Sequence, residues 1–371
     1  MKIVYISRSI IPSRTANSIN VMRMCEAFAT LGHEVILFAP WTKKLEEKNV
    51  DDFFEYYGVK QNFKLEKIFS PSIKYLKKRI YSFICLQKVK KLKPDLVYGR
   101  DDMLAFYLAK RNGFNTLFER HEPFVKNDFD RWVFTKFLNL KQSSRQLVVI
   151  SKNLQKMYVD GFDMKLDSIL VIQAGTGNYN LSDLPLEYTL PNSQINIGYI
   201  GSLLKGKGIE IIIQLSQYFK DINFHIIGGN EKDIKFWKVK SNMCNNLIFH
   251  GFINPKETYK YRNMCDILIA PYQTTSAENK DCEYMSPIKI FEYMASKKAI
   301  ICSSLPGIKE CIDERHVVFA DNTDINSWVE AVNYFRNNPE KIKQLSNNAY
   351  EHSVKNFTYE ARAQKIVNEF T

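Results

Sequence analysis

Residues 201–208 combine the residue types that bind a phosphate group. The segment Gly201-Ser202-Leu203-Leu204-Lys205-Gly206-Lys207-Gly208 follows an apolar run and precedes a predicted helix. Glycines let the backbone approach an anion, and a helix N-terminus offers free N–H groups and a partial positive charge. Lys207 adds a mobile cation suited to a diphosphate. The loop has neither the Gly-Lys-Ser/Thr of a P-loop nor the Gly-x-Gly-x-x-Gly spacing, so a tight turn with a solvated lysine is the alternative.

A second chemical signal begins at Ser286. Ser286 and Pro287 are typical of a helix cap and first turn, and the helical pattern continues to about Ser296. A carboxylate at Glu292, one turn into this helix, could accept hydrogen bonds from both hydroxyls of a ribose. The alternative is an amphipathic helix with a solvated Glu292 that can pair with Lys289. From this element alone the alternative is favoured.

His121 follows a predicted strand in the segment Glu119-Arg120-His121-Glu122-Pro123. A histidine between charged residues can serve a site, or it can equally be exposed and idle. A metal site is not indicated, because the scattered cysteines contain no Cys-x-x-Cys pair and the histidines show no i, i+4 pairing. We interpret the cysteines as reduced core thiols.

Two series of strand and helix signals must position these residues. Apolar runs predict strands at 2–6, 35–38, 95–98, 116–119, 147–150 and 169–172, then at 195–200, 224–229, 267–270, 299–302 and 316–319. Helical spacing or caps predict helices at 19–31, 103–110, 152–160 (ended by Gly161), 209–219 and 357–370. Strand, helix, strand is the unit of a parallel sheet, whose ligands bind beyond the carboxyl ends of the strands. We therefore expect an α/β chain of two doubly wound domains, 1–180 and 190–355, joined by a linker near 178–193.

The charge pattern bears on partners and location. The chain has 371 residues and a formal net charge of +12, which suits an acidic partner: a phosphorylated substrate, an anionic lipid or a nucleic acid. Residues Lys74 to Lys93 contain no acidic residue and interleave lysines with apolar side chains. Such a segment can lie on an anionic bilayer, or it can be a packed helix with a solvated lysine face. There is neither a signal peptide nor an apolar run of about 18 residues, so we expect the cytoplasm, with the protein on the inner face of the plasma membrane.

Together these motifs resemble the family-4 retaining glycosyltransferases of the GT-B fold. Lys289-Ile290-Phe291-Glu292-Tyr293-Met294-Ala295, followed by the run Ala299-Ile300-Ile301, resembles the donor-binding helix of that family. Matching segments occur in the family's order along nearly the whole chain: Lys2–Ser7, Leu31–Val35, Val148–Ser151, Val171–Gly175, Gly198–Ser202 with Lys207-Gly208, Phe249–Phe252 and Cys265–Pro271.

The resemblance implies two Rossmann-like domains facing across a cleft, with the final helix, about 357–371, crossing back onto the first. It places Lys207 on the donor diphosphate, Glu292 on the ribose, and His121 near the donor sugar and its leaving phosphate. The implied catalytic residues are His121, Lys207 and Glu292. The implied donor-binding residues are Gly201, Ser202, Lys205, Lys207, His250, Phe252, Tyr284, Ser286, Pro287, Ile288, Lys289 and Glu292. The implied acceptor-side residues are Arg14, Thr15, Ala16, Asn17, Arg120 and His121, with Glu119 a further candidate.

Three positions depart from the family pattern. Tyr284 stands where a sugar-binding glutamate is usual, with Glu283 beside it. Ser202 replaces an arginine, which leaves Lys207 and Lys205 as the phosphate cations. Thr15-Ala16 replaces a pair of glycines in the N-terminal loop. These departures indicate a different sugar or a different grip on the phosphates.

We expect a retaining, metal-independent transfer of a sugar from a UDP- or GDP-linked donor to a glycan or polyprenyl-linked acceptor, in bacterial surface polysaccharide synthesis. No cofactor and no nucleic-acid partner are expected. One alternative is a GT-B sugar-nucleotide epimerase, which needs several carboxylates around the sugar, where Glu283 is the only nearby candidate. Another is a non-catalytic, nucleotide-sugar-binding partner subunit, suggested by Tyr284, Ser202 and Thr15-Ala16.

Overall fold

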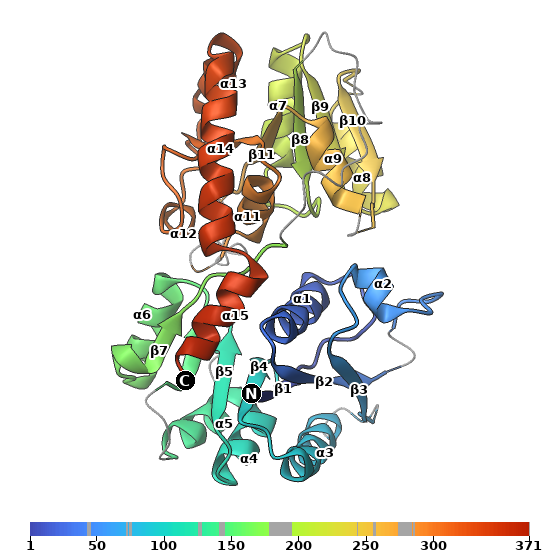
Figure 1. The fold of residues 1–371 in the computed structure, drawn as a ribbon. Coiled ribbons are helices and arrows are strands. Elements are labelled where there is room, and N and C mark those ends of the chain that lie inside the picture. Colours follow the sequence, from blue (N-terminus) through green and yellow to red (C-terminus); the bar gives the residue numbers. More distant parts are fainter. Residues whose placement is uncertain are drawn as a thin grey trace. The chain divides into compact units, whose positions relative to one another are not determined.

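The computed structural model describes residues 1–370 except 43–45, 72, 74–75, 125–127, 141–144, 178–194, 243, 255–256, 274–283 and 285. The chain divides into two compact units. Unit 1 comprises Met1–Gln173 and Tyr359–Thr371, so both chain ends belong to it (Figure 1). Unit 2 comprises Ala174–Thr358. The linker expected near 178–193 lies outside the described residues.

Unit 1 is built on a parallel sheet in the strand order β3-β2-β1-β4-β5-β6-β7. Its strands are β1 (Lys2–Ile6), β2 (Glu34–Trp41), β3 (Lys64–Phe69), β4 (Leu96–Arg100), β5 (Thr116–Arg120), β6 (Leu147–Val149) and β7 (Ile169–Val171). The central strands are continuous apolar runs because helices cover both faces of a parallel sheet. The strand order reverses between β1 and β4, and that switch point is where doubly wound sheets bind ligands.

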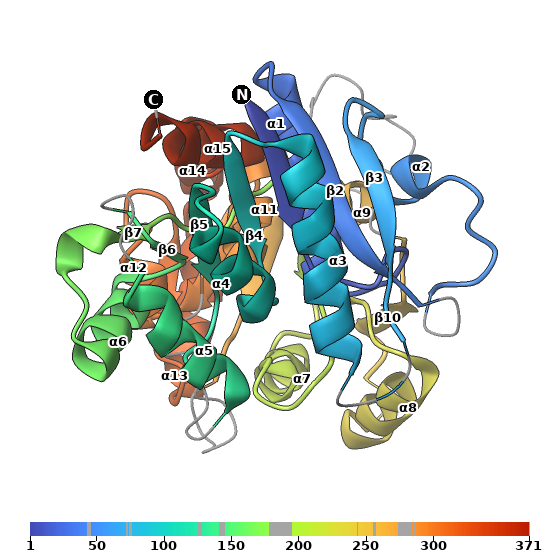
Figure 2. The same ribbon diagram turned by 90° about the horizontal axis from the view of Figure 1, so that it is seen from below.

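The helices of unit 1 cover the two faces of this sheet. They are α1 (Ala16–Thr30), α2 (Phe53–Tyr57), α3 (Lys77–Leu92), α4 (Met103–Arg111), α5 (Phe129–Leu138), α6 (Lys152–Phe162), the 3₁₀ turn η1 (Leu166–Ser168) and α15 (Tyr359–Asn368). Helix α15 packs against α1 on one face (Figure 1), whereas α3, α4 and α5 pack side by side on the other (Figure 2). The C-terminal helix is therefore part of unit 1.

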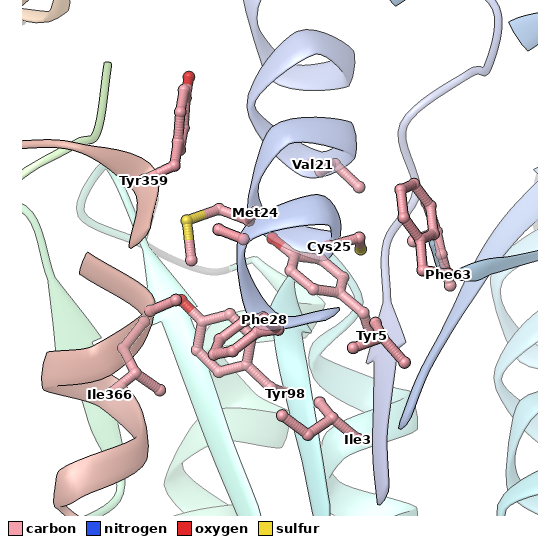
Figure 3. Close-up of a cluster of buried hydrophobic side chains, with 14 of the residues drawn as sticks. Ile3, Tyr5, Val21, Met24, Cys25, Phe28, Phe63, Tyr98, Tyr359 and Ile366 are labelled. Atoms are coloured by element: carbon pink, nitrogen blue, oxygen red, sulfur yellow. The ribbon is translucent and has the colours of Figure 1, made fainter. Parts of the chain in front are cut away.

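Aromatic side chains form the centre of the unit 1 core (Figure 3). The Tyr98 ring contacts the Tyr5 and Phe28 rings edge to face, with centroids 5.2 and 5.3 Å apart. Ile366 and Tyr359 of α15 belong to the same buried cluster. The core of unit 1 is thus completed by residues from the far end of the chain.

Unit 2 repeats the same topology with a parallel sheet in the order β10-β9-β8-β11-β12-β13. Its strands are β8 (Asn196–Ile200), β9 (Asn223–Ile227), β10 (Leu247–Gly251), β11 (Ile267–Ala270), β12 (Ala299–Ser303) and β13 (Val318–Ala320). Its helices are α7 (Ile209–Tyr218), α8 (Glu231–Lys240), α9 (Thr258–Met264), α11 (Ile288–Ala295), α12 (Pro306–Lys309), α13 (Ile325–Asn337) and α14 (Pro339–Asn356). The switch point of this sheet lies between β8 and β11.

Two parallel, doubly wound α/β sheets confirm the predicted fold class, but several boundaries differ from the prediction. Helix α1 begins at Ala16 because the Thr15 side chain caps it by accepting from the Ser18 amide. Helix α6 continues through Gly161 and ends at Asp163, which adopts a left-handed conformation with φ of 53°. None of the helices in the described part of the chain combines the length and apolar character that crossing a bilayer requires.

Candidate functional site

The glycine-rich loop of unit 2 leaves the carboxyl end of β8 at the switch point of the sheet. Its backbone is anchored on both sides: the Tyr199 hydroxyl donates to the Ser202 carbonyl at 2.7 Å, and the Gln273 amide donates to the Gly206 carbonyl at 3.0 Å. Gly208 has φ of +80°, and a Cβ there would lie 1.8 Å from the Pro271 carbonyl oxygen. Only glycine allows the loop to pass this close to the segment after β11.

Two lysine side chains converge on this loop. The Lys289 Nζ lies 3.7 Å from the centroid of the Tyr199 ring and 5.2 Å from that of Tyr272. The Lys207 Nζ lies 5.6 Å from the same Tyr272 centroid. A Cβ at Gly201 would lie 2.9 Å from the Lys289 Nζ, so the ammonium group rests directly on the loop. Lys289 was expected among the donor-binding residues from the resemblance, and the structure brings its ammonium group to the loop.

The electrostatic state of Lys289 reflects this crowding. Burial, and then the neighbouring Lys207 ammonium, lower the pKa of Lys289 well below its usual value, while Glu292 opposes the shift. Within the described residues, neither ammonium group takes part in an ion pair. Two cations without a carboxylate partner favour the binding of an anion, because an anion removes their mutual repulsion.

Helix α11 begins beside the loop with Ile288 and has Pro287 at its cap position. The prediction that Ser286 caps this helix is wrong. Its hydroxyl instead accepts from the Ala174 amide at 2.9 Å, and no side chain caps the helix. The Ile288 and Ile290 amides donate to the Ser286 and Pro287 carbonyls at 2.9 and 2.8 Å, so in this first turn the Lys289 amide is the group suited to an anion.

Glu292 lies in the middle of α11 with its side chain about one-third exposed. Its Oε2 is 3.7 Å from Nη1 of the fully buried Arg262, so the ion-pair partner is Arg262 and not Lys289. Arg262 is fixed by donating from Nε to the Ser296 hydroxyl at 2.8 Å and from Nη1 to the Thr258 hydroxyl at 3.2 Å. One carboxylate oxygen of Glu292 is therefore oriented by the protein.

His250 belongs to a row of polar side chains at the edge of the same sheet. His225 Nε2 lies 3.1 Å from the Asn196 Oδ1, and its Nδ1 lies 3.0 Å from the His250 Nε2. Because Asn196 accepts, neutral His225 donates from Nε2 and accepts from His250. Burial, and then the neighbouring His250, lower the pKa of His225 to about 4. His225 is therefore neutral and serves to orient the His250 ring.

The remaining predicted donor residues of unit 2 differ in their exposure. Ser202 and Lys205 are exposed, and the exposed Phe252 follows directly after β10. Tyr284 is half-buried, whereas Glu283, the carboxylate on which the epimerase alternative depends, lies outside the described residues. The structure brings together Gly201, Lys207 and Lys289.

In unit 1, His121 is held by a charged cluster at the carboxyl ends of β4 and β5. Its Nε2 bonds the Glu119 Oε1, and the Arg100 Nη1 lies 3.0 Å from its Nδ1. Because a carboxylate only accepts and a guanidinium only donates, the imidazole is neutral, with its proton on Nε2. Burial, and then the Arg100 guanidinium, lower the pKa of His121 to about 4. His121 is therefore a partly buried, uncharged group, not an idle loop residue.

Glu119 lies fully inside unit 1 and cannot reach an acceptor, contrary to the expectation from the sequence. Its carboxylate forms a two-pronged ion pair with Arg362 of α15: Nη1 to Oε2 is 3.2 Å and Nη2 to Oε1 is 3.1 Å. The Tyr98 hydroxyl also donates to Oε2. Burial raises the pKa of Glu119, but Arg362, His121 and Arg100 outweigh it and hold the pKa well below the usual value. Glu119 is therefore ionised.

The acceptor-side residues predicted in the N-terminal loop lie at the switch point of the unit 1 sheet. Arg14 is exposed and pairs with Glu47 at 2.5 Å, while Thr15 caps α1 and Ala16 begins it. Asn17 Nδ2 donates to Asp101 at 2.8 Å. Asp101 follows β4 and has φ of 75°, a left-handed conformation that a non-glycine residue rarely adopts outside turns and functional sites.

Arg120 points into its own loop. Its guanidinium donates to the Glu122 and Pro123 carbonyls and lies 4.4 Å from the centroid of the Phe124 ring. The Arg120 side chain is half-buried, and these contacts stabilise the loop that follows His121. In the described residues of both units, no cluster of histidine, cysteine, aspartate or glutamate side chains is arranged to hold a metal ion.

Comparison with known protein families covers both units. Residues 19–176 match the family described as Glycosyltransferase Family 4, and residues 185–352 match Glycosyl transferases group 1. The chain belongs to the family-4 glycosyltransferases. A search of curated protein sequences finds no match.

Solved glycosyltransferase structures resemble this family-4 glycosyltransferase over its whole length. A glycosyltransferase from Rickettsia africae shares 15% identity with a TM-score of 0.76, over 100% of this chain and 97% of that chain. Anabaena HepE in complex with UDP-glucose shares 15% identity with a TM-score of 0.69, over 99% and 98%. The lipopolysaccharide outer core galactosyltransferase WaaB shares 14% identity with a TM-score of 0.68, over 100% and 99%. These likenesses show that the enzyme has the GT-B fold.

Several residues of the two sites are missed by sequence reasoning in this glycosyltransferase. The run Arg100-Asp101 at the end of a strand is a signal that could have been used, because charged residues there lie at the ligand-binding edge of the sheet. Arg262 and Arg362 carry no such signal. Each is one arginine on a helix, and only the fold shows which carboxylate it meets.

Proposed function

We propose that this family-4 glycosyltransferase is a retaining enzyme that transfers a sugar from a UDP-linked donor to a glycan or lipid-linked acceptor of a bacterial surface polysaccharide. The observation that carries the proposal is the pair of ammonium groups, Lys207 and Lys289, on the glycine loop beside the start of α11. A nucleoside diphosphate supplies the anion that this arrangement lacks. Lys289 then takes the place of the arginine that the family has at Ser202.

The two ends of the donor are assigned to different groups. The diphosphate is assigned to the Lys207 and Lys289 side chains and the Lys289 amide, and the ribose hydroxyls are assigned to the Glu292 carboxylate that Arg262 orients. UDP is the nucleotide we favour, because the structurally similar HepE has been seen with UDP-glucose. His250 and Phe252 are assigned to the base.

In the reaction, negative charge builds on the leaving phosphate while the bond to the anomeric carbon breaks. Preorganised cations and helix amides stabilise that charge without reorganisation, and this contribution is usually the largest in such reactions. No metal ion is required in this scheme, because the lysines meet the diphosphate charge. His121 is assigned to the sugar end of the donor as an uncharged group, and the charge beside it comes from Arg100.

The acceptor is assigned to unit 1, at the residues that follow β1 and β4. Asn17 and Asp101 offer an amide and a carboxylate at the switch point, where sugar hydroxyls can be bound. Arg14 and Thr15 border the same position. A polysaccharide acceptor agrees with the structural similarity to WaaB, a lipopolysaccharide outer core galactosyltransferase.

Helix α3 supports association with the inner face of a membrane. Arg79, Phe83 and Lys90 are exposed at helical spacing and form one stripe, and Phe83 is 57% exposed. Lys78 and Lys88, by contrast, are paired with Asp130 and Glu66. Lys74, at the start of the predicted basic segment, lies outside the described residues.

The stripe, not the whole basic segment, is the surface to test. Each exposed cation contributes roughly 1 kcal/mol at an anionic surface. Arg79→Glu with Lys90→Glu should reduce sedimentation with vesicles that contain phosphatidylglycerol and leave transfer to a soluble acceptor unchanged. Arg111→Glu, a charge change on α4, is the control. Equal sedimentation of both variants would remove the membrane proposal.

A panel of UDP- and GDP-linked sugars, with and without a glycan acceptor and with a metal chelator, tests the function. Nucleotide release that requires acceptor and survives the chelator, with a product of unchanged anomeric configuration, is the expected result. A sugar that is altered while it stays on its nucleotide would establish an epimerase instead. Donor binding with no turnover would favour the partner subunit.

A further inference from the structure

The ion pair between Glu119 and Arg362 is the most completely buried charge pair of unit 1. The two side chains are 0% and 1% exposed and are 243 residues apart in the sequence. Arg362 also donates from Nε to the Gln173 carbonyl at 2.8 Å and from Nη2 to the Ile172 carbonyl at 3.5 Å. Its guanidinium therefore ties α15 to the end of β7 and to β5.

A buried ion pair is a costly way to stabilise a protein. Apolar residues of the same volume often give equal or greater stability, so retention of such a pair calls for a second explanation. Here the second explanation is the contact that the same carboxylate makes with His121. The Glu119 Oε1 that faces Arg362 is also the atom that accepts the His121 Nε2 proton.

Arg362 determines the ionisation of Glu119, and Glu119 in turn determines the protonation and orientation of His121. Glu119 keeps the imidazole proton on Nε2 while it is ionised, because a carboxylate only accepts, whereas a protonated carboxyl can also donate to the ring nitrogen. In a fully buried position a carboxylate stays ionised only if a cation is paired with it. Arg362 is that cation, and its planar fork also fixes the direction of both carboxylate oxygens.

We propose that Arg362 is a positioning residue for the transferase reaction: through Glu119 it holds His121 as the neutral, Nε2-protonated imidazole. The C-terminal helix α15 thereby helps to set the protonation state of His121, which directly follows β5. This inference rests on the proposed role of His121. The charged groups that face the imidazole are Glu119, Arg100 and Arg362.

The test compares three variants in the full chain. Arg362→Gln removes the charge but keeps donors, Arg362→Lys keeps the charge but loses the fork, and Glu369→Gln is the control. Glu369 lies just beyond α15 and pairs with Arg145 at 2.9 Å on the surface, so its loss removes a tether of the same chain end without touching Glu119. The first readout is the nitrogen NMR spectrum of the His121 imidazole in the free protein, followed through a pH titration.

In Arg362→Gln, the pair of His121 and Glu119 should take up a proton at least about one pH unit higher than in the wild type, because a neighbouring cation has been lost. The turnover number kcat should fall about 10- to 100-fold while KM for the donor changes less than about threefold. Arg362→Lys should restore the imidazole titration and part of kcat. Glu369→Gln should match the wild type in both readouts.

An imidazole titration that is unchanged in folded Arg362→Gln would overturn the inference, even if activity were reduced, since the effect would then be structural. If Arg362→Gln does not fold, Arg362→Lys decides: wild-type kcat in that variant would also overturn the inference. Inactivity of the wild-type chain with every donor would defeat the proposed function alone. The titration needs no substrate and would still decide the role of Arg362.

Discussion

The two units place buried charge in opposite ways. In unit 1, the carboxylate of Glu119 is surrounded by donors from Arg362, Tyr98 and His121, so each group is satisfied by the protein itself. In unit 2, the ammonium groups of Lys207 and Lys289 lie against the glycine loop with no ion-pair partner among the described residues. A cluster whose charges are all paired fixes geometry, whereas lysines without a carboxylate partner favour the binding of an anion. This difference is the basis for the proposed positioning role of Arg362 and the proposed donor site at Lys207 and Lys289.

The largest effect is expected from breaking the paired cluster of unit 1. Glu119→Gln leaves the Arg362 guanidinium buried without a counter-charge and should lower the free energy of unfolding by about 3–5 kcal/mol. Urea unfolding monitored by circular dichroism measures this loss. Glu369→Gln, which removes a surface ion pair near the same helix, should cost less than about 1 kcal/mol. The double variant Glu119→Leu/Arg362→Met should recover much of the loss, and equal instability of the single and double variants would contradict the buried-pair account.

Removing a proposed ligand group of unit 2 should affect donor use most strongly. Lys207→Ala and Glu292→Ala are each expected to lower kcat/KM for the donor by at least about 100-fold, because each removes a proposed contact to the diphosphate or the ribose. Thermal unfolding of Lys207→Ala should stay close to that of the wild type, whereas Glu292→Ala leaves the buried Arg262 without its ion-pair partner and should be less stable. Lys232→Ala, on the exposed face of α8, is the matched control. Near wild-type rates in either site variant would refute the assigned donor site.

Protonation of His225 gives a smaller effect that depends on pH. Its pKa is about 4 in the folded protein, below the usual 6.5, so the unfolded chain binds more protons between these values. Stability is therefore complete above about pH 6.5 and falls as the pH is lowered, by about 2 kcal/mol at pH 5. In His225→Gln, the free energy of unfolding should differ less between about pH 6.5 and pH 5 than in the wild type. Urea unfolding at the two pH values measures this difference. An unchanged slope would mean that His250 and the nearby Asp266 compensate.

The smallest effect distinguishes the two clusters most directly. Lys289→Met removes one of two mutually repelling cations, so it should leave the free protein equally stable or stabilise it by about 1 kcal/mol. The same change should weaken binding of UDP about 10-fold, as measured by calorimetry. Lys289→Arg should retain most of the affinity. A destabilised Lys289→Met variant would show that this cation, like Arg362, is satisfied within the protein.

The fold could be predicted where the signal is local. The buried strands β1, β8 and β11 are continuous apolar runs, and they appear in the structure where the pattern places them. The two strands that the sequence analysis does not predict, β3 and β10, are both edge strands of their sheets. An edge strand is partly solvated and carries polar residues, as in Lys64-Leu65-Glu66-Lys67, so it lacks the apolar run that marks a central strand.

The candidate site could be predicted in part for the same reason. The glycine loop and the start of α11 follow from spacing and from the geometry of glycine and proline, which act within a few residues. The prediction for Ser286 fails because its hydroxyl meets the Ala174 amide, a contact between positions far apart in the chain. The Lys289 ammonium could not be placed on the loop from sequence, since its position depends on how α11 packs beside β8.

The sequence by itself thus determined the two doubly wound α/β units, the glycine-rich loop between a strand and a helix, and membership of the family-4 glycosyltransferases. Only the tertiary structure decided how the charges are partnered: Arg362 with Glu119, Arg262 with Glu292, and Lys289 with no carboxylate in the described chain. The physical reason is that the two kinds of interaction act over different separations along the chain. Secondary structure follows from residues a few positions apart, whereas the energy of two charges depends on their distance in space and on burial, which the folded chain alone sets.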